Sequence, residues 1–164
     1  MDSIRLAVPS RGDIEFVARN MRAADRAEIM ASSELEPLPC LIRSVKVSSE
    51  VLVALTSGGV PFAIFGVAPV AEGLASPWML GTDEMLRHGK EIVKLSRTFV
   101  KRWASAHGVL SNFVDTRNTT SIAWLKRTGF RMGEPEPFGS RGQFFRRFEG
   151  ASNDFETRHI RGNK

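Results

Sequence analysis

Two short runs of β-branched and aromatic residues give the clearest local pattern in the chain. Residues 51–55 and 60–67 form these runs, and the segment between them contains Gly58 and Gly59. Glycine adopts positive φ angles without a steric cost, which the tight turns between antiparallel strands require. The pattern therefore predicts a β-hairpin over residues 51–67.

Two other segments have the spacing of amphipathic helices. After Ser10 and Asp13, which both suit a helix cap, hydrophobic residues recur at i, i+3, i+4 and i+7, which predicts a helix from Ser10 to Met21. A long helix is predicted to follow residues 82–84 and to end near His107, before Gly108. Its hydrophobic face comprises Ile92, Leu95, Phe99, Trp103 and Ala106, and a second face carries Arg87, Lys90, Lys94, Arg97 and Lys101.

The order of the predicted elements indicates the fold class. It runs strand 4–8, helix 10–21, helix 24–32, an amphipathic segment at 38–45, the hairpin, strand 76–81, the long helix, strand 110–114, helix 119–128 and strand 143–148. This order suits a mixed sheet with helices on its faces. We predict one α/β domain over residues 1–149. Residues 150–164 have no sustained hydrophobic period and are predicted to form a polar, flexible tail.

Composition and charge restrict the function classes only slightly. The chain has 164 residues and a formal net charge of +5, so weak attraction to nucleic acid, an acidic protein surface or the phosphates of a nucleotide-like cofactor is expected. Its single cysteine, Cys40, excludes an internal disulfide and is expected to be a small buried residue. The three histidines lack metal-ligand spacing, so no metal site is expected.

Neither export nor a membrane span is expected. The N-terminus lacks the basic start, apolar stretch and cleavage site of a signal peptide. The most extended apolar region, residues 60–80, is interrupted by three prolines, two glycines and Glu72. Such a sequence makes a poor membrane helix but suits two short buried strands and their connection.

The late part of the chain resembles a known enzyme family. Residues 112–118 and 122–130 resemble the strand-loop-helix-strand region of the GCN5-related N-acetyltransferases, with Asn118, Trp124, Gly129 and Phe130 on the family pattern. The segments at 4–7 and 10–21 match the family's first strand and first helix. The resemblance covers roughly residues 4–148 and implies a mixed, mostly antiparallel sheet.

A narrower resemblance points to a virus. Residues 18–23, 65–67, 78–83 and 114–118 together are similar to a small podophage family described as internal virion or head-morphogenesis proteins. Membership implies a location in the virion or in the infected bacterial cytoplasm, with other virion proteins as partners.

The broader resemblance implies where a cofactor binds. Its members hold acetyl-coenzyme A (acetyl-CoA) between two splayed parallel strands, and the loop after the first of them wraps the diphosphate. The positions that match are Leu80, Gly81, Arg87, His88, Gly89, Lys90 and Asn118. Asp83 and Glu84 place negative charge near the diphosphate and oppose its binding. The alternative for this segment is an ordinary acidic helix start, stabilised by the helix dipole.

The residues for catalysis are less clear than those for binding. The family often uses a tyrosine on the helix after Asn118 as the acid, but this sequence contains no tyrosine and has Leu125 at the matching position. Asp83, Glu84 and Asp115 are candidate bases, although none has a partner that marks it out. We therefore assign no catalytic residue from the sequence.

Two further groups of side chains have alternative interpretations. The basic face from Arg87 to Lys101 fits a solvated helix surface, or a docking face for DNA or an acidic virion protein. The three tryptophans, Trp78, Trp103 and Trp124, lie in apolar patterns and are predicted to belong to the core.

Two function hypotheses follow, and a third is weaker. The first is a phage head or internal virion protein that uses an acetyltransferase-like fold as an assembly module, with impaired or absent activity. The alternative is an active acetyl-CoA-dependent N-acetyltransferase that acts on a host protein or a small amine. The third is a nucleic-acid-binding accessory protein, whose binding would depend steeply on salt.

Overall fold

The protein contains one mixed sheet of seven strands, in the order β1-β2-β3-β4-β5-β7-β6. The computed structural model describes residues 3–156. Its strands are β1 (Arg5–Ala7), β2 (Glu50–Leu55), β3 (Pro61–Ala71), β4 (Leu74–Gly81), β5 (Val109–Asp115), β6 (Arg131–Phe138) and β7 (Gln143–Gly150). Neighbouring strands are antiparallel except β4 and β5, which are parallel. The predicted fold class, a mixed and mostly antiparallel sheet with helices on both faces, is confirmed.

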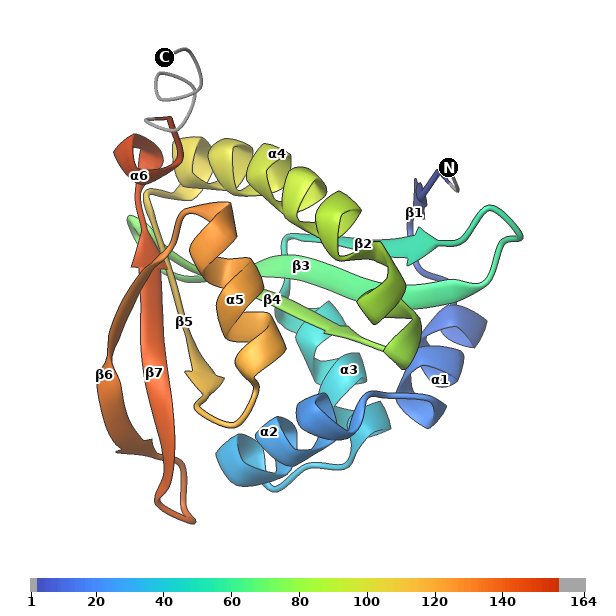
Figure 1. Cartoon of the computed structure of the whole chain (residues 1–164), viewed down its shortest axis with the longest axis horizontal. Helices are drawn as coiled ribbons and strands as arrows, with labels where there is room; N and C mark the ends of the chain where they lie inside the picture. The colour runs from blue at the N-terminus through green and yellow to red at the C-terminus, as the bar shows by residue number, and fades with distance from the viewer. Residues whose placement is uncertain (1–2, 157–164) are drawn as a thin grey trace.

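The helices cover both faces of this sheet (Figure 1). They are α1 (Arg11–Arg19), α2 (Ala23–Ser33), α3 (Pro37–Val47), the short 3-10 helix η1 (Asp83–His88), α4 (Gly89–His107), α5 (Thr119–Thr128) and α6 (Ser152–Glu156). Side chains alternate across a strand, so Ile64 and Phe65 of β3 point to opposite faces. Ile64 packs with Val17 of α1 and Leu41 of α3, whereas Phe65 packs with Phe99 of α4. The sheet therefore separates two hydrophobic cores.

Local sequence signals fix the ends of several helices. At the start of α1, the backbone N–H of Asp13 donates to Ser10 Oγ (3.1 Å) and the N–H of Ser10 donates back to Asp13 Oδ2 (2.9 Å), which is a capping box. Gly108 ends α4 with a φ of 95°, and a Cβ there would lie 2.6 Å from the carbonyl oxygen of Gly73. Only glycine fits this turn, which brings the starts of β4 and β5 together.

The parallel pair β4 and β5 is joined at one end and open at the other. The two strands pair only at Leu74 with Val109 and at Ala75 with Leu110. Beyond these pairs β4 follows β3 and β5 follows β7, so the strands diverge. Near the point of divergence, Asn112 Nδ2 donates to the carbonyl oxygen of Pro77 (3.0 Å) and bridges the widening gap. The sheet is thus split along its middle.

The structure contains a strand that the sequence pattern did not predict. We expected Phe138 to lie in a loop before the last strand, but residues 131–138 form β6, which pairs with β7. Pro135 and Pro137 concealed this strand, because proline cannot donate to a sheet ladder. They are tolerated here because β6 is an edge strand, and its register shifts between Met132 and Pro135.

The segment predicted as a tail is partly packed. Strand β7 extends to Gly150, and α6 places Phe155 in the core, where its side chain is 7% exposed and contacts the ring of Phe130 edge-on. One aromatic side chain thus anchors a five-residue helix, and a search for hydrophobic periodicity cannot detect so short an element. The rest of the predicted tail, residues 157–164, lies outside the described residues.

Candidate functional site

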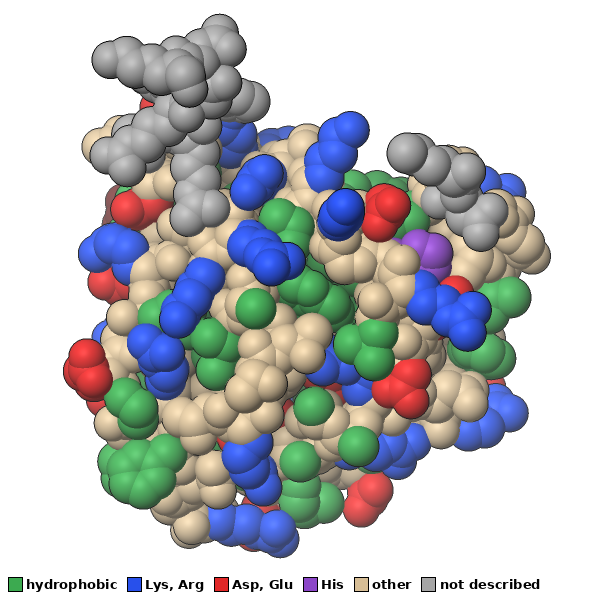
Figure 2. Space-filling model, viewed as in Figure 1, with side chains coloured by type: hydrophobic (Ala, Val, Ile, Leu, Met, Phe, Trp, Pro, Cys, Tyr) green, Lys and Arg blue, Asp and Glu red, His purple; other side chains and the backbone are tan. Residues whose placement is uncertain are grey.

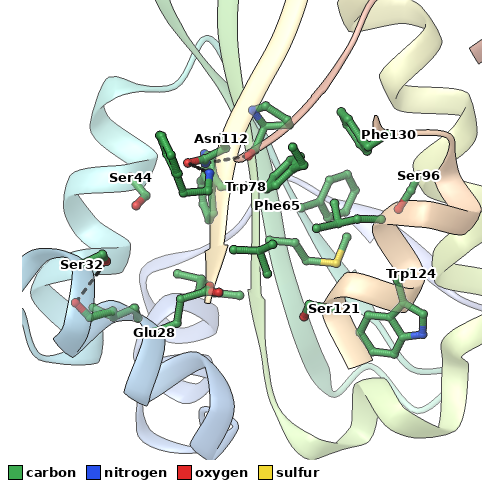
Figure 3. A pocket seen from close by; sticks show the side chains of 18 of the residues that line it. Glu28, Ser32, Ser44, Phe65, Trp78, Ser96, Asn112, Ser121, Trp124 and Phe130 are labelled. Carbon is green, nitrogen blue, oxygen red and sulfur yellow. Dashed lines mark hydrogen bonds between the residues drawn. The ribbon is translucent and has the colours of Figure 1, made fainter. Parts of the chain in front are cut away.

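A cavity of about 470 Å³ occupies the gap between the diverging strands β4 and β5. Its walls come from both faces of the sheet (Figure 3). Glu28, Ser32 and Ser44 lie on the side of α2 and α3, whereas Ser96 and Trp124 lie on the side of α4 and α5. Because the sheet is split here, one cavity is lined by side chains from both faces of the sheet.

The cavity has mostly apolar and aromatic walls with a few polar groups, as small-molecule sites usually do. Trp78 and Trp124 are partly exposed and line it, so they are not simply core residues as predicted. Trp103 is 4% exposed and fits that prediction better, although it also contacts the cavity. Cys40 is partly exposed on its wall, and burial raises the pKa of its thiol, so the thiol is neutral at physiological pH.

Glu28 is the acidic residue that lines this cavity in the described part of the chain. It lies on α2 and is half-buried, and its Oε1 accepts a hydrogen bond from the backbone N–H of Asp115 at 2.7 Å. No ion pair reaches Glu28 from any residue between 3 and 156. Burial, together with the negative charges of Asp25 and Asp115, raises the pKa of Glu28 to about 8. Its carboxyl can therefore exchange a proton near neutral pH.

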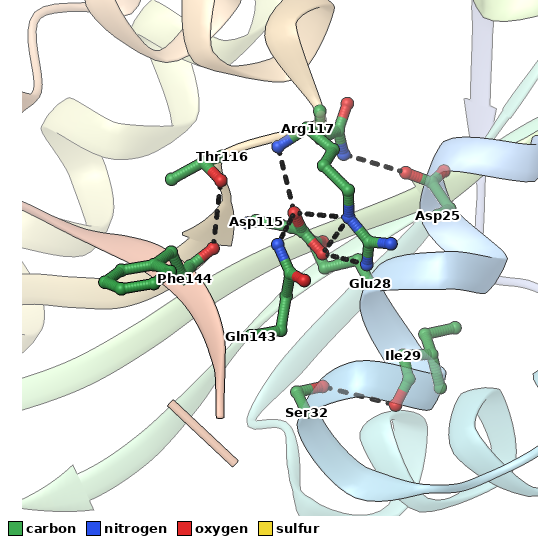
Figure 4. A network of polar contacts seen from close by, with 10 residues as sticks. Asp25, Glu28, Ile29, Ser32, Asp115, Thr116, Arg117, Gln143 and Phe144 are labelled. Carbon is green, nitrogen blue, oxygen red and sulfur yellow. Dashed lines mark hydrogen bonds and ion pairs between the residues drawn. The ribbon is translucent and has the colours of Figure 1, made fainter. Parts of the chain in front are cut away.

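Asp115 lies beside Glu28 but has the opposite electrostatic character (Figure 4). Burial alone would raise the pKa of Asp115, but hydrogen bonds and the ion pair from Arg117 lower it below its ordinary value. The Arg117 side chain folds back onto this carboxylate, with Nη2 2.6 Å from Oδ2, and the Asp115 side chain is 1% exposed. Asp115 therefore stays charged and paired with Arg117, which makes it a poor candidate for a general base.

A buried polar network holds the open end of the cavity together. Arg22, Asp25 and Asn118 are each at most 5% exposed. Arg22 Nη2 donates to Asn118 Oδ1 (3.2 Å), and Asn118 Nδ2 donates to Asp25 Oδ1 (3.4 Å). Asp25 Oδ2 accepts from the backbone N–H of Gly81 (3.1 Å). The network joins the start of α2, the end of β4 and the start of α5, and so fixes the distance between the diverging strands.

The residues predicted to bind a cofactor lie in different surroundings. Leu80 lines the cavity, and Gly81 follows it at the end of β4, packed so closely that a Cβ would lie 2.5 Å from the carbonyl oxygen of Phe62. Asn118 belongs to the buried network. Lys90 is exposed on α4, and Gly89 lies under the ring of Trp124.

The segment predicted to wrap a diphosphate is helical instead of an open loop. Thr82 Oγ1 caps η1 by accepting from the N–H of Glu84 (3.3 Å), and η1 continues directly into α4. Arg87 forms an ion pair with Glu84 (3.8 Å), and His88 stacks on the ring of Phe62. The first turn of η1 carries Asp83 and Glu84, as the alternative of an acidic helix start required, and phosphate binding by this segment stays a prediction.

Sequence reasoning missed Glu28, and it named three candidate bases, Asp83, Glu84 and Asp115, that do not line the cavity. A glutamate on a helix ordinarily indicates a solvated face, so the pattern gave no signal. The arrangement of α2 against the end of β5 is what buries this side chain.

Neither a metal site nor a membrane span is found in residues 3–156. No three His, Cys, Asp or Glu side chains among them are placed to hold a metal ion. None of the helices in that range is both long and apolar enough to cross a membrane.

Comparison with known proteins gives matches in structure but not in sequence. No protein-family model matches the chain, and no curated protein matches it. Spermidine N-acetyltransferase from Vibrio cholerae, solved with CoA and spermine, superposes with a TM-score of 0.63 at 14% identity, over 93% of this chain and 97% of that one.

Two further acetyltransferases give similar agreement. An acetyltransferase of the GNAT family from Bacillus anthracis has a TM-score of 0.69 at 8% identity, over 92% of this chain and 95% of that one. Ribosomal-protein-S5-alanine acetyltransferase from Vibrio fischeri has a TM-score of 0.66 at 10% identity, over 95% and 99%. The chain therefore has the fold of the GCN5-related N-acetyltransferases.

Proposed function

We propose that the protein is an acetyl-CoA-dependent N-acetyltransferase whose acceptor is an amine. The observation that carries this proposal is the cavity between β4 and β5, with walls on both faces of the sheet. A thioester that enters from the side of α4 and α5 would meet an amine that enters from the side of α2 and α3. Holding two reactants in contact in this way supplies much of the rate enhancement of a transfer reaction.

The edge of β4 offers hydrogen-bonding groups to an extended ligand. Beyond Ala75 the β4 strand has no ladder partner on the side of β5. Unpaired strand edges readily accept another chain that carries amide groups. The pantetheine arm of CoA is such a chain, and its amides would pair with β4 between Trp78 and Leu80, next to the cavity.

The phosphates of CoA would be attracted by side chains. In η1, which replaces an open loop, the backbone N–H groups of Glu84 and Met85 already donate to Thr82 and so are not free for a ligand. Lys and Arg side chains gather over α4 and α5 (Figure 2). Lys90 and Lys94 are exposed on α4, and neither forms an ion pair with another residue of the described chain. We expect these lysines to supply positive charge beside the diphosphate.

Glu28 is positioned for the proton transfer that the reaction requires. Transfer forms a bond between the acceptor nitrogen and the acetyl carbonyl carbon, and it breaks the bond between that carbon and the CoA sulfur. The ammonium group loses two protons in total. The carboxylate of Glu28 takes the first and passes it to solvent, and the second ends on the sulfur, which leaves as a thiol. A base whose pKa lies near the working pH is effective in this role.

The assembly hypothesis stays a prediction. A role in a phage head, a location in the virion or infected cytoplasm, and nucleic-acid binding have no observation in the structure that favours them. An assembly module also gains nothing from a large cavity, because unfilled space inside a protein weakens its packing.

Isothermal titration with acetyl-CoA, CoA and pantetheine at low and moderate salt tests the proposal. We expect all three to bind, and only the two phosphate-bearing ligands to bind more weakly as salt rises. Replacing Lys90 and Lys94 by glutamine should weaken CoA but not pantetheine, whereas Lys46→Gln on exposed α3 serves as the control. If acetyl-CoA does not bind the wild-type protein at any salt concentration, the transferase proposal is wrong.

A further inference from the structure

Glu28 and Arg43 are the two charged residues that line the cavity within residues 3–156. Glu28 comes from α2 and Arg43 from α3, so both belong to the wall on the acceptor side of the split sheet. The cavity therefore presents one acidic and one basic group to whatever enters from this side.

Arg43 makes no polar contact within the described chain that would explain its position. Its side chain is exposed, and it forms no hydrogen bond or ion pair with any residue of the described chain. A guanidinium group has a fixed planar array of donors that forms bidentate hydrogen bonds with carboxylate, phosphate and related anions. An unpaired arginine at the wall of a cavity is thus suited to receive an anionic group.

The remainder of this wall is suited to an apolar body. Trp78 of β4 and Phe113 of β5 line the cavity, and Phe113 stacks on Phe138 of β6 with ring centroids 4.2 Å apart. Ser32 of α2 and Ser44 of α3 also line the cavity and add hydroxyl groups to this wall. Polyamines fit this wall poorly, because a second ammonium group would find no second carboxylate and would be repelled by Arg43.

We propose that the acceptor is a small primary amine that also carries an anionic group, with the amine bound at Glu28 and the anionic group bound at Arg43. This inference rests on the proposed transferase function for its chemistry, but the binding that it describes is measurable alone. Carboxylate and phosphonate are both anions of the required kind, and the experiment separates them.

Binding is tested first, without CoA. Ligand-observed NMR is recorded with ω-amino carboxylic acids of increasing chain length, each compared with the alkylamine and the diamine of the same chain, and with the matching aminophosphonate. We expect one chain length to bind best as the amino acid or aminophosphonate, at least about tenfold more tightly than its alkylamine. Equal binding of the alkylamine or the diamine would overturn the inference.

Two variants assign the contacts. Arg43→Gln should remove the preference for the anionic ligand and leave alkylamine binding and CoA affinity unchanged. Glu28→Gln should weaken every amine and leave CoA affinity unchanged. Lys46 lies one turn beyond Arg43 on α3, is exposed and does not line the cavity. Lys46→Gln is therefore the matched control and should leave the binding of every ligand unchanged. A loss for Lys46→Gln equal to that for Arg43→Gln would indicate diffuse charge, and the assignment of Arg43 would fail.

Thiol release from acetyl-CoA then links binding to transfer. We expect kcat/KM to follow the binding order, with the loss in Arg43→Gln appearing mainly in KM for the anionic acceptor. If CoA binds but the preferred acceptor is a diamine, the acceptor inference fails and the transferase proposal stands. If the amino acid binds but CoA does not, the transferase proposal fails and the ligand assignment stands.

Discussion

Glu28 and Asp115 are neighbours at the end of β5, yet their pKa values shift in opposite directions. Asp115 is buried and Glu28 is half-buried, and loss of contact with water acts to raise the pKa of both. Arg117 reverses the effect at Asp115, whereas no cation is paired with Glu28 in the described chain. The position of one arginine side chain thus decides which carboxyl is permanently charged and which can carry a proton.

The charge state of Glu28 predicts a specific dependence of stability on pH. Its pKa rises from 4.5 to about 8 on folding, so the folded state binds the extra proton between these values. The contribution of Glu28 to the free energy of unfolding is therefore fully present below pH 4.5. It decreases as pH rises to about 8, by at most about 1.4 kcal/mol per pH unit. Glu28→Gln should match the wild type near pH 4.5 and be more stable above pH 8.

Urea denaturation of both proteins across this range checks the prediction. The difference between the two free energies of unfolding is the relevant quantity, because Asp25, Asp115 and Arg117 face Glu28 in both proteins and their contributions largely cancel. A difference that does not change with pH would show that Glu28 is charged throughout.

Asp25 is the residue whose removal should be most damaging to the network. Asp25→Ala leaves the guanidinium of Arg22 buried without its ion-pair partner and removes the acceptor of the Gly81 N–H. Breaking a buried pair in this way costs about 3–5 kcal/mol. Denaturant unfolding should show this loss, while Glu72→Ala, at an exposed turn position, should be nearly neutral. Comparable effects of both substitutions would mean that the network contributes little.

At the scale of elements, the sequence predicted those that have their own local signals. The α5 helix was predicted at its observed bounds because Asn118 caps it, with Oδ1 accepting from the N–H of Ser121, and Gly129 ends it. The hairpin of β2 and β3 was predicted from its β-rich runs and turn glycines. By contrast, β6 and α6 depend on contacts with distant parts of the chain. Strand β6 pairs with the edge of β7, and α6 is held by the packing of Phe155 in the core.

Helix α6 gives a prediction at this scale. Phe155 contacts Phe130, and a Cβ added at Gly150 would lie 2.5 Å from its ring. Phe155→Ala should therefore destabilise the protein by about 3 kcal/mol, as expected for loss of a buried aromatic ring. The matched control is Phe144→Ala on β7, whose side chain is 50% exposed and which should cost much less. Thermal unfolding of the two variants measures the difference.

The candidate site was less predictable than the elements that form it. Leu80 was identified from the family resemblance and does line the cavity. Glu28 and Arg43 were not identified, because each occupies an ordinary polar position on an amphipathic helix. Their importance arises from the divergence of β4 and β5, which is a property of the assembled sheet and leaves no local pattern.

At the scale of the whole molecule, a ligand in the gap should stabilise the fold. Acetyl-CoA in this position would contact both halves of the split sheet, and a ligand that binds only the folded state stabilises it by mass action. The gain is about 2.7 kcal/mol at about 100 times Kd. Thermal unfolding with increasing acetyl-CoA should show a Tm that rises continuously, whereas a constant Tm would contradict binding to the folded domain.

The Arg22, Asp25 and Asn118 network also has a consequence for how the protein is made. Its hydrogen bonds join residues separated by 56, 93 and 96 positions in the sequence. Contacts of such separation form late, because long loops must close before they can form. On the ribosome, an emerging chain that lacks Asn118 cannot form this network, even if strands β1 to β4 have already folded. The capacity to bind a ligand in the gap is thus acquired only after Asn118 has been added to the chain and has reached the folded part.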